Sequence, residues 1–580
     1  TAKTLINDLL QRPRVVYTIM KRSILILMAL IASVAFPILA QEVPDTILFN
    51  GKIITVDYSF STQQAIAIQG ELITAIGSNE TIEALAGPDT RKVDLGGRTV
   101  IPGLIDNHLH MLRATEYWPN EARLDGVSSR AEALEILKSK ADSMSDGEWL
   151  MTLGGWTENQ FADSRADFTL AELDAVAPDR PAFLQSTYDH ALVNSVWLNQ
   201  MDIAVVGEAS SGEGLASHVL RDDAGNATGR LNGGISMVAK AIQKFPSVSP
   251  ERQIEAIKSA FTYLNSIGLT GMYDPGGVGI NEETYNRIHR VAEESGLTVR
   301  VFHTLFGGAP STPEQAQEIV EQIENARGFQ GNQTIDRIGI GEIYYTPFHW
   351  DSLFDAKTPT AEDITAAKGI LIAAAKGGWQ LQTHASQPGT IKVLLDVMEE
   401  VNAEYPLRQL RWSVTHGDLV DRETVERMKH MGMNLQLRSV SVLTQPRRYR
   451  LIEEMGEAAY DVPPLRMVQN SGIPYGLGTD GTKATQINPF VSLWWAVSGR
   501  ALNGDLVLKQ TLSREDALIA HTRSNSYLMF QENYTGSLRP GLLADMVVLD
   551  RDYMTVPVDE IREIKPVATI VGGDLVWGQL

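Results

Sequence analysis

The amino-acid sequence predicts an α/β protein built around a (β/α)8 barrel. Three observations lead to this prediction. Apolar strand-like runs alternate with helical stretches between about residues 101 and 530, short segments rich in Ile, Val and Thr lie at both ends, and the interval from about 116 to 250 carries more elements than one barrel crossover requires. Strands that alternate with helices are typical of a parallel sheet, and most often of a barrel at this length.

The two ends of the chain are expected to form one small β domain. Residues 41–100 contain "DTILFNGKIITVD", "AIAIQGELITAIG" and "TRKVDLGGRTVIPG", and residues 531–580 contain "GSLRPGLLADMVVLD" and "VATIVGGDLVWG". Short β-branched runs separated by Gly, Asn and Asp turns are typical of antiparallel strands. The boundary between this domain and the barrel, residues 101–530, is expected near Val100.

Eight apolar runs are predicted to be the barrel strands: "TVIPGLID", "GLTGMYD", "TVRVFHTL", "IDRIGIGEIYY", "WQLQTHA", "LRWSVTHG", "MNLQLRS" and "IPYGLGTD". The interval from about 116 to 250 interrupts this alternation of strands and helices. It contains helices, two strand-like runs, "EWLMTLGGW" and "PAFLQSTYDH", and a Gly-rich turn. We expect an insertion after the first barrel strand, over the barrel mouth.

The stretch "MKRSILILMALIASVAFPILAQ" has the layout of a secretory signal peptide that starts at Met20 and is cleaved after Ala40, with residues 1–19 upstream of it. A membrane anchor is the alternative. The apolar run of residues 24–40 is short for a spanning helix, which needs about 20 residues, and it contains Pro37. We therefore expect an exported protein, most simply in a bacterial periplasm, with no stable membrane span after cleavage.

Composition excludes several classes of site. The formal net charge of -21 and the absence of a dense basic run argue against nucleic-acid binding. The chain has no cysteine, so disulfides, thiolate ligands and a cysteine nucleophile are excluded and metal ligands must come from His, Asp and Glu. A small-molecule substrate is expected, and the sequence leaves an oligomer open.

Polar residues at the ends of the predicted strands are the functional candidates, because active sites of βα barrels lie at the C-terminal ends of their strands. In "DNHLH", His108 and His110 lie two residues apart and share a face of the first strand. The other candidates follow the fourth, fifth, sixth and eighth strands: Glu342, His384, His416 and Asp480. Taken alone, each is compatible with a structural histidine or a turn residue. Together they predict a site for Zn²⁺ or a similar divalent ion.

The sequence resembles the amidohydrolase superfamily and, within it, amidohydrolase family 3, the YtcJ-like branch. The resemblance covers most of the chain from Gln41 onward and is carried by "GKIITVD", "GGRTVIPGLIDNHLH", "GGWTENQF", "DHALVNS", "RDDAGNATG", "THA", "THGDLV", "GTD" and "GSLRPGLLADMVVLD". It implies a distorted barrel, a β-sandwich built from both termini, and a metal centre at the barrel mouth.

The resemblance also implies a ligand set. His108, His110 and Asp480 would bind the more buried metal. His384 and His416 would bind the second. Many relatives bridge the two ions with a carboxylated lysine after the fourth strand, but this chain reads "RIGIGEIYYTPF", where Glu342 is the available substitute. A glutamate can bridge two ions or lie beside one, so one or two metals per chain, first of all Zn²⁺, fit the sequence.

The implied chemistry is hydrolysis of a non-peptide C–N bond of the amide type. A divalent ion lowers the pKa of bound water from 15.7 towards about 7 and makes hydroxide available at neutral pH. Asp480 would take a proton from that water as general base and pass it to the leaving nitrogen. Two alternatives stay open: a deaminase of a nitrogen heterocycle with a single metal, and a non-catalytic binding or regulatory protein on the same scaffold.

Four further residues are candidates for substrate binding. His190 in "DHALVNS" would hydrogen-bond substrate across the mouth or hold the insertion together. Trp156 and Tyr188 would line an apolar pocket or belong to the core. Arg438 would clamp a substrate carboxylate or form a salt bridge to the insertion. No catalytic role is predicted for the six other histidines: His218, His289, His303, His349, His430 and His521.

Overall fold

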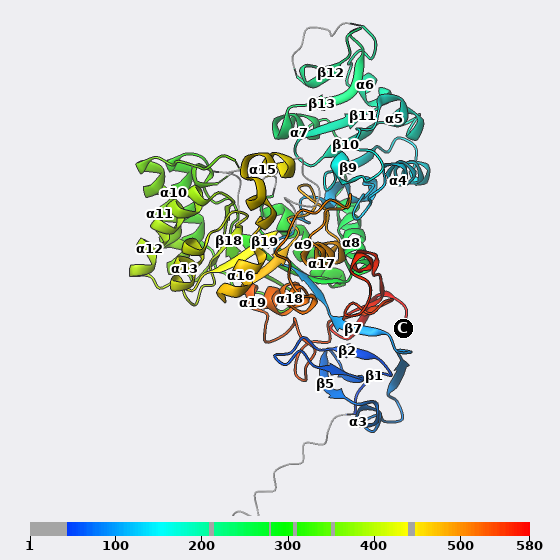
Figure 1. Ribbon diagram of the computed structural model, residues 1–580, viewed down its shortest axis with the longest axis vertical. Helices are drawn as coiled ribbons and strands as arrows, with labels where there is room; N and C mark the ends of the chain where they lie inside the picture. The colour runs from blue at the N-terminus through cyan, green and yellow to red at the C-terminus, as the bar shows by residue number, and fades with distance from the viewer. Residues whose placement is uncertain (1–42, 208–213, 278–279, 306–309, 350–353, 439–446) are drawn as a thin grey trace, which may run out of the picture.

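The computed structural model describes residues 43–207, 214–277, 280–305, 310–349, 354–438 and 447–580. The signal peptide predicted from Met20 to Ala40 lies outside these residues. Figure 1 shows three parts along the long axis: strands from both termini at one end, the barrel in the middle, and the insertion at the other end. Within the described residues, no helix combines the length and the apolar character needed to cross a membrane.

Both termini build the sandwich, as expected. One sheet has the order β5-β4-β1-β6, and the other, β23-β22-β21-β7-β2-β3, pairs N-terminal with C-terminal strands. These elements are β1 (Thr46–Phe49), β2 (Lys52–Ile54), β3 (Thr62–Gln63), β4 (Ala65–Gln69), β5 (Leu72–Gly77), α3 (Asn79–Glu83), β6 (Arg91–Asp94), β7 (Thr99–Pro102), β21 (Met546–Leu549), β22 (Pro566–Val571) and β23 (Asp574–Gly578).

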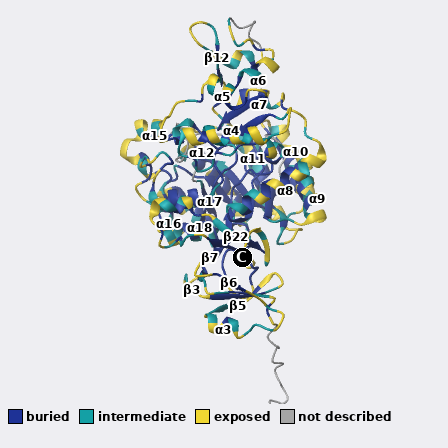
Figure 2. Cartoon of the chain, turned by 90° about the vertical axis from the view of Figure 1, so that its right-hand side faces the viewer, coloured by how far each residue is buried: buried dark blue, intermediate teal, exposed yellow. Residues whose placement is uncertain are grey.

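The eight parallel strands of the barrel follow one another in chain order, β8-β14-β15-β16-β17-β18-β19-β20. They are β8 (Leu104–Asp106), β14 (Leu269–Asp274), β15 (Arg300–Leu305), β16 (Ile335–Ile340), β17 (Gln380–Ala385), β18 (Ser413–His416), β19 (Asn434–Arg438) and β20 (Tyr475–Gly478). The strands are buried in the centre of the molecule (Figure 2), because helices cover their outer face.

The helices around the barrel are α8 (Pro250–Ser266), α9 (Glu282–Ser295), α10 (Pro313–Asn325), α11 (Ala361–Gly377), α12 (Pro388–Glu404), α13 (Arg422–Met431), α15 (Arg447–Met455), α16 (Leu465–Ser471), α17 (Pro489–Ser498), α18 (Arg514–Ala520) and α19 (Arg523–Leu528). Helix α8 illustrates why these segments are helical. Ser249 caps its first turn by accepting from the Arg252 N–H, and Pro250 occupies the first helical position. Its buried residues recur at helical spacing: Ala256, Ile257, Ala260, Phe261 and Leu264.

The insertion is a mixed sheet with helices. Its strand order is β12-β13-β11-β10-β9, so it holds five strands rather than the two expected from sequence. Its elements are α4 (Arg130–Ser143), β9 (Leu150–Leu153), α5 (Leu170–Val176), β10 (Ala182–Ser186), β11 (His190–Val193), α6 (Ser195–Gln200), β12 (Val219–Arg221), β13 (Ala227–Asn232) and α7 (Gly234–Ile242). The Gly-rich turn lies between β12 and β13. β12 has three residues and is half exposed, whereas β13 has six and its buried positions, Ala227, Gly229 and Leu231, include the small residues Ala and Gly, which made the strand hard to recognise.

The predicted first barrel strand is in fact two strands. β7 pairs with β21 and β2 in the sandwich, whereas β8 pairs with β14 in the barrel. Gly103 separates them where the chain passes Thr270, and a Cβ on Gly103 would lie 2.1 Å from the Thr270 hydroxyl. A continuous apolar run therefore crosses from one sheet to the other.

The sandwich is fastened to the barrel by a buried ion pair. Arg300, the first residue of β15, donates from Nε and Nη2 to the two carboxylate oxygens of Asp545, at 2.6 and 2.8 Å. Asp545 directly precedes β21 in the sandwich, and both side chains are buried.

Replacing this arginine is expected to destabilise the whole chain. Arg300→Met leaves the Asp545 carboxylate buried without its cation, which typically costs about 3–5 kcal/mol. Urea unfolding should show this loss, and the double variant Arg300→Met/Asp545→Leu should recover much of it, because the buried charge is then also removed. A single variant as stable as the wild type would show that the pair does not join the two parts.

Candidate metal centre

The six side chains predicted to be metal ligands converge at the C-terminal ends of the barrel strands. His108 and His110 follow β8, Glu342 follows β16, His384 lies in β17, His416 ends β18, and Asp480 follows β20. Within the described residues three overlapping groups place their ligand atoms within 4.8 Å of one another: His108, His416 and Asp480; His108, His110 and Glu342; and Glu342, His384 and His416.

Glu342 occupies the centre of this arrangement. Its Oε1 lies 3.1 Å from His110 Nε2. Its Oε2 lies 3.0 Å from His416 Nε2 and 3.1 Å from His384 Nδ1. Oε2 also lies 3.5 Å from His108 Nε2, so the one carboxylate is surrounded by all four histidines.

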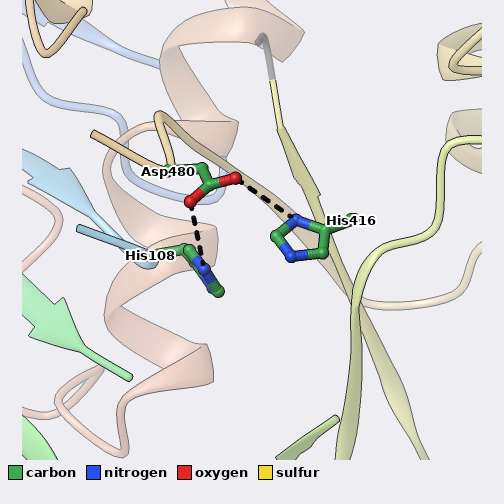
Figure 3. A group of neighbouring side chains, drawn as sticks. All are labelled: His108, His416 and Asp480. Atoms are coloured by element: carbon green, nitrogen blue, oxygen red, sulfur yellow. Dashed lines mark ion pairs between the residues drawn. The ribbon is translucent and has the colours of Figure 1, made fainter. Parts of the chain in front are cut away.

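Asp480 is the second carboxylate that faces the histidines (Figure 3). Its two oxygens point to His108 Nε2 and His416 Nδ1, at 3.8 and 3.9 Å. His110 Nε2 is 3.3 Å from Oδ1. Arg438 donates from Nη1 to Oδ2 at 2.9 Å. The carboxylate is therefore held in place by one arginine while it faces the imidazoles.

The backbone at two of these residues adopts the left-handed region, with φ of 71° at His416 and 56° at Asp480. For residues with a Cβ this conformation costs about 1–3 kcal/mol and is found mostly at functional sites. His416 is the last residue of β18 and Asp480 follows β20 by two residues, so both conformations occur where a barrel strand ends. The surrounding contacts must supply the energy that holds this geometry.

The first and eighth strands are locked together beneath the site. The Asp480 N–H donates to the His108 carbonyl at 2.8 Å, and the His110 N–H donates to the Gly481 carbonyl at 2.6 Å. Asp106 adds to this by accepting from the Thr479 hydroxyl and from the His108 N–H. These bonds align the histidines of β8 with the aspartate of β20.

A second set of contacts orients His110. Its Nδ1 donates to the Gly276 carbonyl at 2.8 Å, which leaves Nε2 free to face the carboxylates. Asp274 holds that loop by accepting from the Gly276 and Leu112 N–H groups. Such a partner fixes the tautomer of a histidine ligand.

The donor set fits a divalent cation. Both ring nitrogens of His108 and the Nδ1 atom of His416 are buried. Within the described part of the chain, none of these three atoms has a hydrogen-bond partner. His416 Nε2 also lies only 2.8 Å from His384 Nδ1. Four imidazoles gathered around two carboxylates are the ligands that Zn²⁺ and related ions bind.

The protonation states agree with this fit. Burial lowers the pKa of His108 to about 3 and also lowers that of His416, so both rings are neutral at pH 7. Burial raises the pKa of Glu342 and of Asp480, but the neighbouring histidines outweigh it and hold both pKa values well below their usual range. Burial also lowers the pKa of His110, yet Asp480 and Glu342 raise it to about 9, so a cation bound there would release a proton.

The comparisons with known proteins identify the family. The model described as "Amidohydrolase family" matches residues 91–577. The chain belongs to amidohydrolase family 3. It is 24% identical over 554 residues to N-substituted formamide deformylase of Arthrobacter pascens (92% of this chain, 98% of the relative). It is also 24% identical over 538 residues to the amidohydrolase YtcJ of Bacillus subtilis (89% and 96%), so the YtcJ-like resemblance is confirmed.

Solved structures share the fold. An uncharacterized metal-dependent hydrolase from Pyrococcus furiosus aligns with a TM-score of 0.59 at 21% identity, over 88% of this chain and all of the other. An adenosine deaminase from Xanthomonas campestris with bound zinc aligns at 0.51 and 13% identity, over 92% of each. The sequence-based prediction of a barrel with a terminal β domain is confirmed. This amidohydrolase carries a buried His, Glu and Asp cluster that could hold a divalent ion.

Arg438 of the amidohydrolase binds acids of the barrel. Its guanidinium pairs with Asp480 and, at 2.8 Å, with Asp418, and it also contacts the Ser386 hydroxyl. All three partners follow barrel strands. Within the described residues the expected salt bridge to the insertion is thus wrong. The two Nη groups are engaged with the barrel's own acids, whereas Nε is buried without an acceptor.

Trp156 belongs to the core of the insertion. Its indole is 1% exposed, its Nε1 donates to the Thr152 hydroxyl, and its ring packs near Phe161 and Phe168. This position supports the alternative that Trp156 is a core residue.

His190 and Tyr188 lie at the edge of the insertion. His190 is buried and faces Asp189 at 3.2 Å and Asp167 at 3.4 Å, contacts that hold the insertion together. Tyr188 is half buried and accepts a hydrogen bond from Arg113 at 2.7 Å.

Several residues beside the site were not predicted from sequence. Asp106, Asp274 and Asp418 support the ligand candidates, and His349, which had no predicted role, donates to the His384 carbonyl at 3.0 Å. Asp106 stands two residues before His108, and this spacing is the one local signal that pointed to it.

Proposed function

We propose that the protein hydrolyses a non-peptide, amide-type C–N bond of a small molecule with two divalent ions, first of all Zn²⁺. The observation that carries the proposal is the position of Glu342, whose carboxylate lies within 3.5 Å of a ring nitrogen of each of the four histidines, with Oε1 beside His110 and Oε2 beside the other three. One carboxylate among four histidines supports a bridge between two ions. A single-metal deaminase would not need this placement.

The candidate residues would have the following roles. His108, His110 and Asp480 would hold one ion, and His384 and His416 the other, with Glu342 shared. When bound, such ions acidify water and polarise a carbonyl group. Asp480 would accept the proton of the attacking water at Oδ1, because Oδ2 is engaged by Arg438, and would deliver it to the leaving nitrogen.

Arg438 supports this role in two ways. Its bond to Oδ2 fixes the rotation of the Asp480 carboxylate, and its charge contributes to the low pKa of that group, so that Asp480 is ionised at neutral pH. Asp418 on the far side of the guanidinium holds Arg438 itself in place.

The choice of test substrates follows from the relatives. One relative that aligns over nearly its full length is an N-substituted formamide deformylase. The zinc-loaded protein should therefore be offered N-formyl and N-acetyl derivatives of simple amines, with release of the amine and of formate or acetate measured together. Equal release of both products supports the proposal. Ammonia released from aminoheterocycles, with no amide cleaved, would support the deaminase instead.

A further inference from the structure

An arginine stands beside the metal centre without an acidic partner. Arg113 follows His110 by three residues, and the two side chains flank Gly277: a Cβ there would lie 3.3 Å from Arg113 Nη1 and 3.4 Å from the His110 ring. On its other side Arg113 donates from Nη2 to the Tyr188 hydroxyl. Arg113 therefore lies between the barrel's ligand candidates and the edge of the insertion.

A second cation lies near the first. Lys483 follows Asp480 by three residues, and its carbonyl accepts from the Gly155 N–H, which joins this loop to the insertion. Burial lowers the pKa of Lys483 to about 8, and the charge of Arg113 lowers it in the same direction. Burial and the like charge of Arg113 therefore both disfavour the charged form of Lys483.

The surrounding acids do not neutralise this pair. Within the described residues, neither Arg113 nor Lys483 forms an ion pair with a carboxylate, and Arg113 Nε is buried without a hydrogen-bond acceptor. Glu121 and Glu116 act on Lys483 only at longer range. Glu121 is already engaged, since its Oε1 accepts from Arg123 and from the Leu153 N–H.

Other arginines near the site show the opposite pattern. Arg123 pairs with both Glu121 and Asp125. Arg438 pairs with both Asp418 and Asp480. Buried charge is costly unless it is paired. Arg113 differs from these two arginines, because within the described residues its side chain donates to a tyrosine hydroxyl and to no carboxylate.

The tyrosine that binds Arg113 is itself influenced by the charges of the metal centre. Burial raises the pKa of the Tyr188 hydroxyl, and the charges of Asp480 and Glu342 act on it in the same direction. Tyr188, Arg113 and Lys483 are each half buried.

We propose that Arg113, with Tyr188 and Lys483 beside it, binds a carboxylate of the substrate, so that the amide cleaved at the metal centre belongs to an N-acylated amino acid. The guanidinium has a planar fork that matches a carboxylate, and one of its five N–H donors is used by Tyr188. A carboxylate there would complete the pairing that the chain leaves open. This inference rests on the proposed function and names its substrate class.

The test uses pairs of compounds that differ only in charge. N-formyl derivatives of glycine, β-alanine, 4-aminobutyric acid and 6-aminohexanoic acid are compared with the corresponding carboxamides, on the zinc-loaded full-length protein. For the chain length that spans the site, kcat/KM of the acid should exceed that of its amide by about 10-fold to 100-fold, since a charge-assisted pair is made only with the acid.

The variants assign that preference to one side chain. Arg113→Met should raise KM for the preferred acid by about the same factor, with little change for its amide, and Arg113→Lys should restore part of it because the charge returns. Arg290→Met removes one positive charge from the outer face of α9, where Arg290 pairs with Glu283, and should change neither compound. Thermal melting of each variant checks that the fold is retained.

Binding of the same pairs, measured by calorimetry, separates this inference from the proposed hydrolysis. Preferential binding of an acid that is lost in Arg113→Met supports the inference even where no amide is cleaved. Equal binding and turnover of acids and amides, or an Arg113→Met variant that weakens both alike, would overturn it and make Arg113 a structural partner of Tyr188.

Discussion

Asp480→Asn is expected to lower kcat for amide hydrolysis by about 10²–10⁴-fold, the usual contribution of a general base. The asparagine oxygen can still accept from Arg438, so the side chain should keep its position. It cannot take up a proton at neutral pH, and for this reason the loss should appear in kcat at nearly unchanged KM. Steady-state rates are measured together with the metal content of each preparation, so that a lost ion is not mistaken for a lost base.

Asp418→Asn is the matched control for this variant. Asp418 binds the same guanidinium as Asp480, at 2.8 Å, yet it belongs to none of the three groups of candidate ligands. Its replacement should loosen Arg438 and lower kcat much less. If Asp480→Asn kept more than a tenth of the wild-type kcat with its metal intact, Asp480 would not be the proton acceptor.

Glu342→Gln is expected to reduce the metal content from two equivalents per chain to one and to lower the rate by at least about 10²-fold, since the second ion no longer assists in the transition state. A glutamine offers one oxygen and one NH₂ group where the carboxylate offers two oxygens. It cannot ligate an ion on each side. Elemental analysis after dialysis against metal-free buffer measures the loss.

The chain offers a control for this loss as well. Glu158, Asp167 and His190 form another acid–histidine group, in the insertion, with ligand atoms within the same 4.8 Å limit. Glu158→Gln should leave two equivalents bound at the barrel mouth. Retention of two ions and full activity in Glu342→Gln would show that Glu342 does not bridge them.

The candidate ligands could be predicted because barrel topology orders them. Parallel strands place their C-terminal ends at one mouth, so a residue at the end of one strand lies near residues at the ends of the others, however far apart they are in sequence. This reasoning brought His108, His384 and Asp480 together correctly, although 372 positions separate the first from the last (480 minus 108). The sequence could not give the position of Glu342 among the four histidines, because it depends on the loop after β16 as well as on the strand.

The contacts that support the candidate ligands could not be predicted from the sequence, and the reason is physical. Asp106 accepts from Thr479 across the closure of the barrel, and nothing in the pattern of either segment points to the other. Arg438 could be placed at the end of its strand, but its choice between the insertion, a substrate and Asp418 depends on which acid lies within reach in three dimensions. Trp156 stands in a family motif and nevertheless packs in the core of the insertion.

The central claim is that six side chains from separate strands share one metal centre. Anomalous diffraction from a crystal of the zinc-loaded protein, collected on both sides of the zinc edge, tests it most directly. The account expects two anomalous peaks, one bounded by His108, His110 and Asp480, the other by His384 and His416, with Glu342 between them. Crystals without a peak at these residues after zinc is added would contradict it.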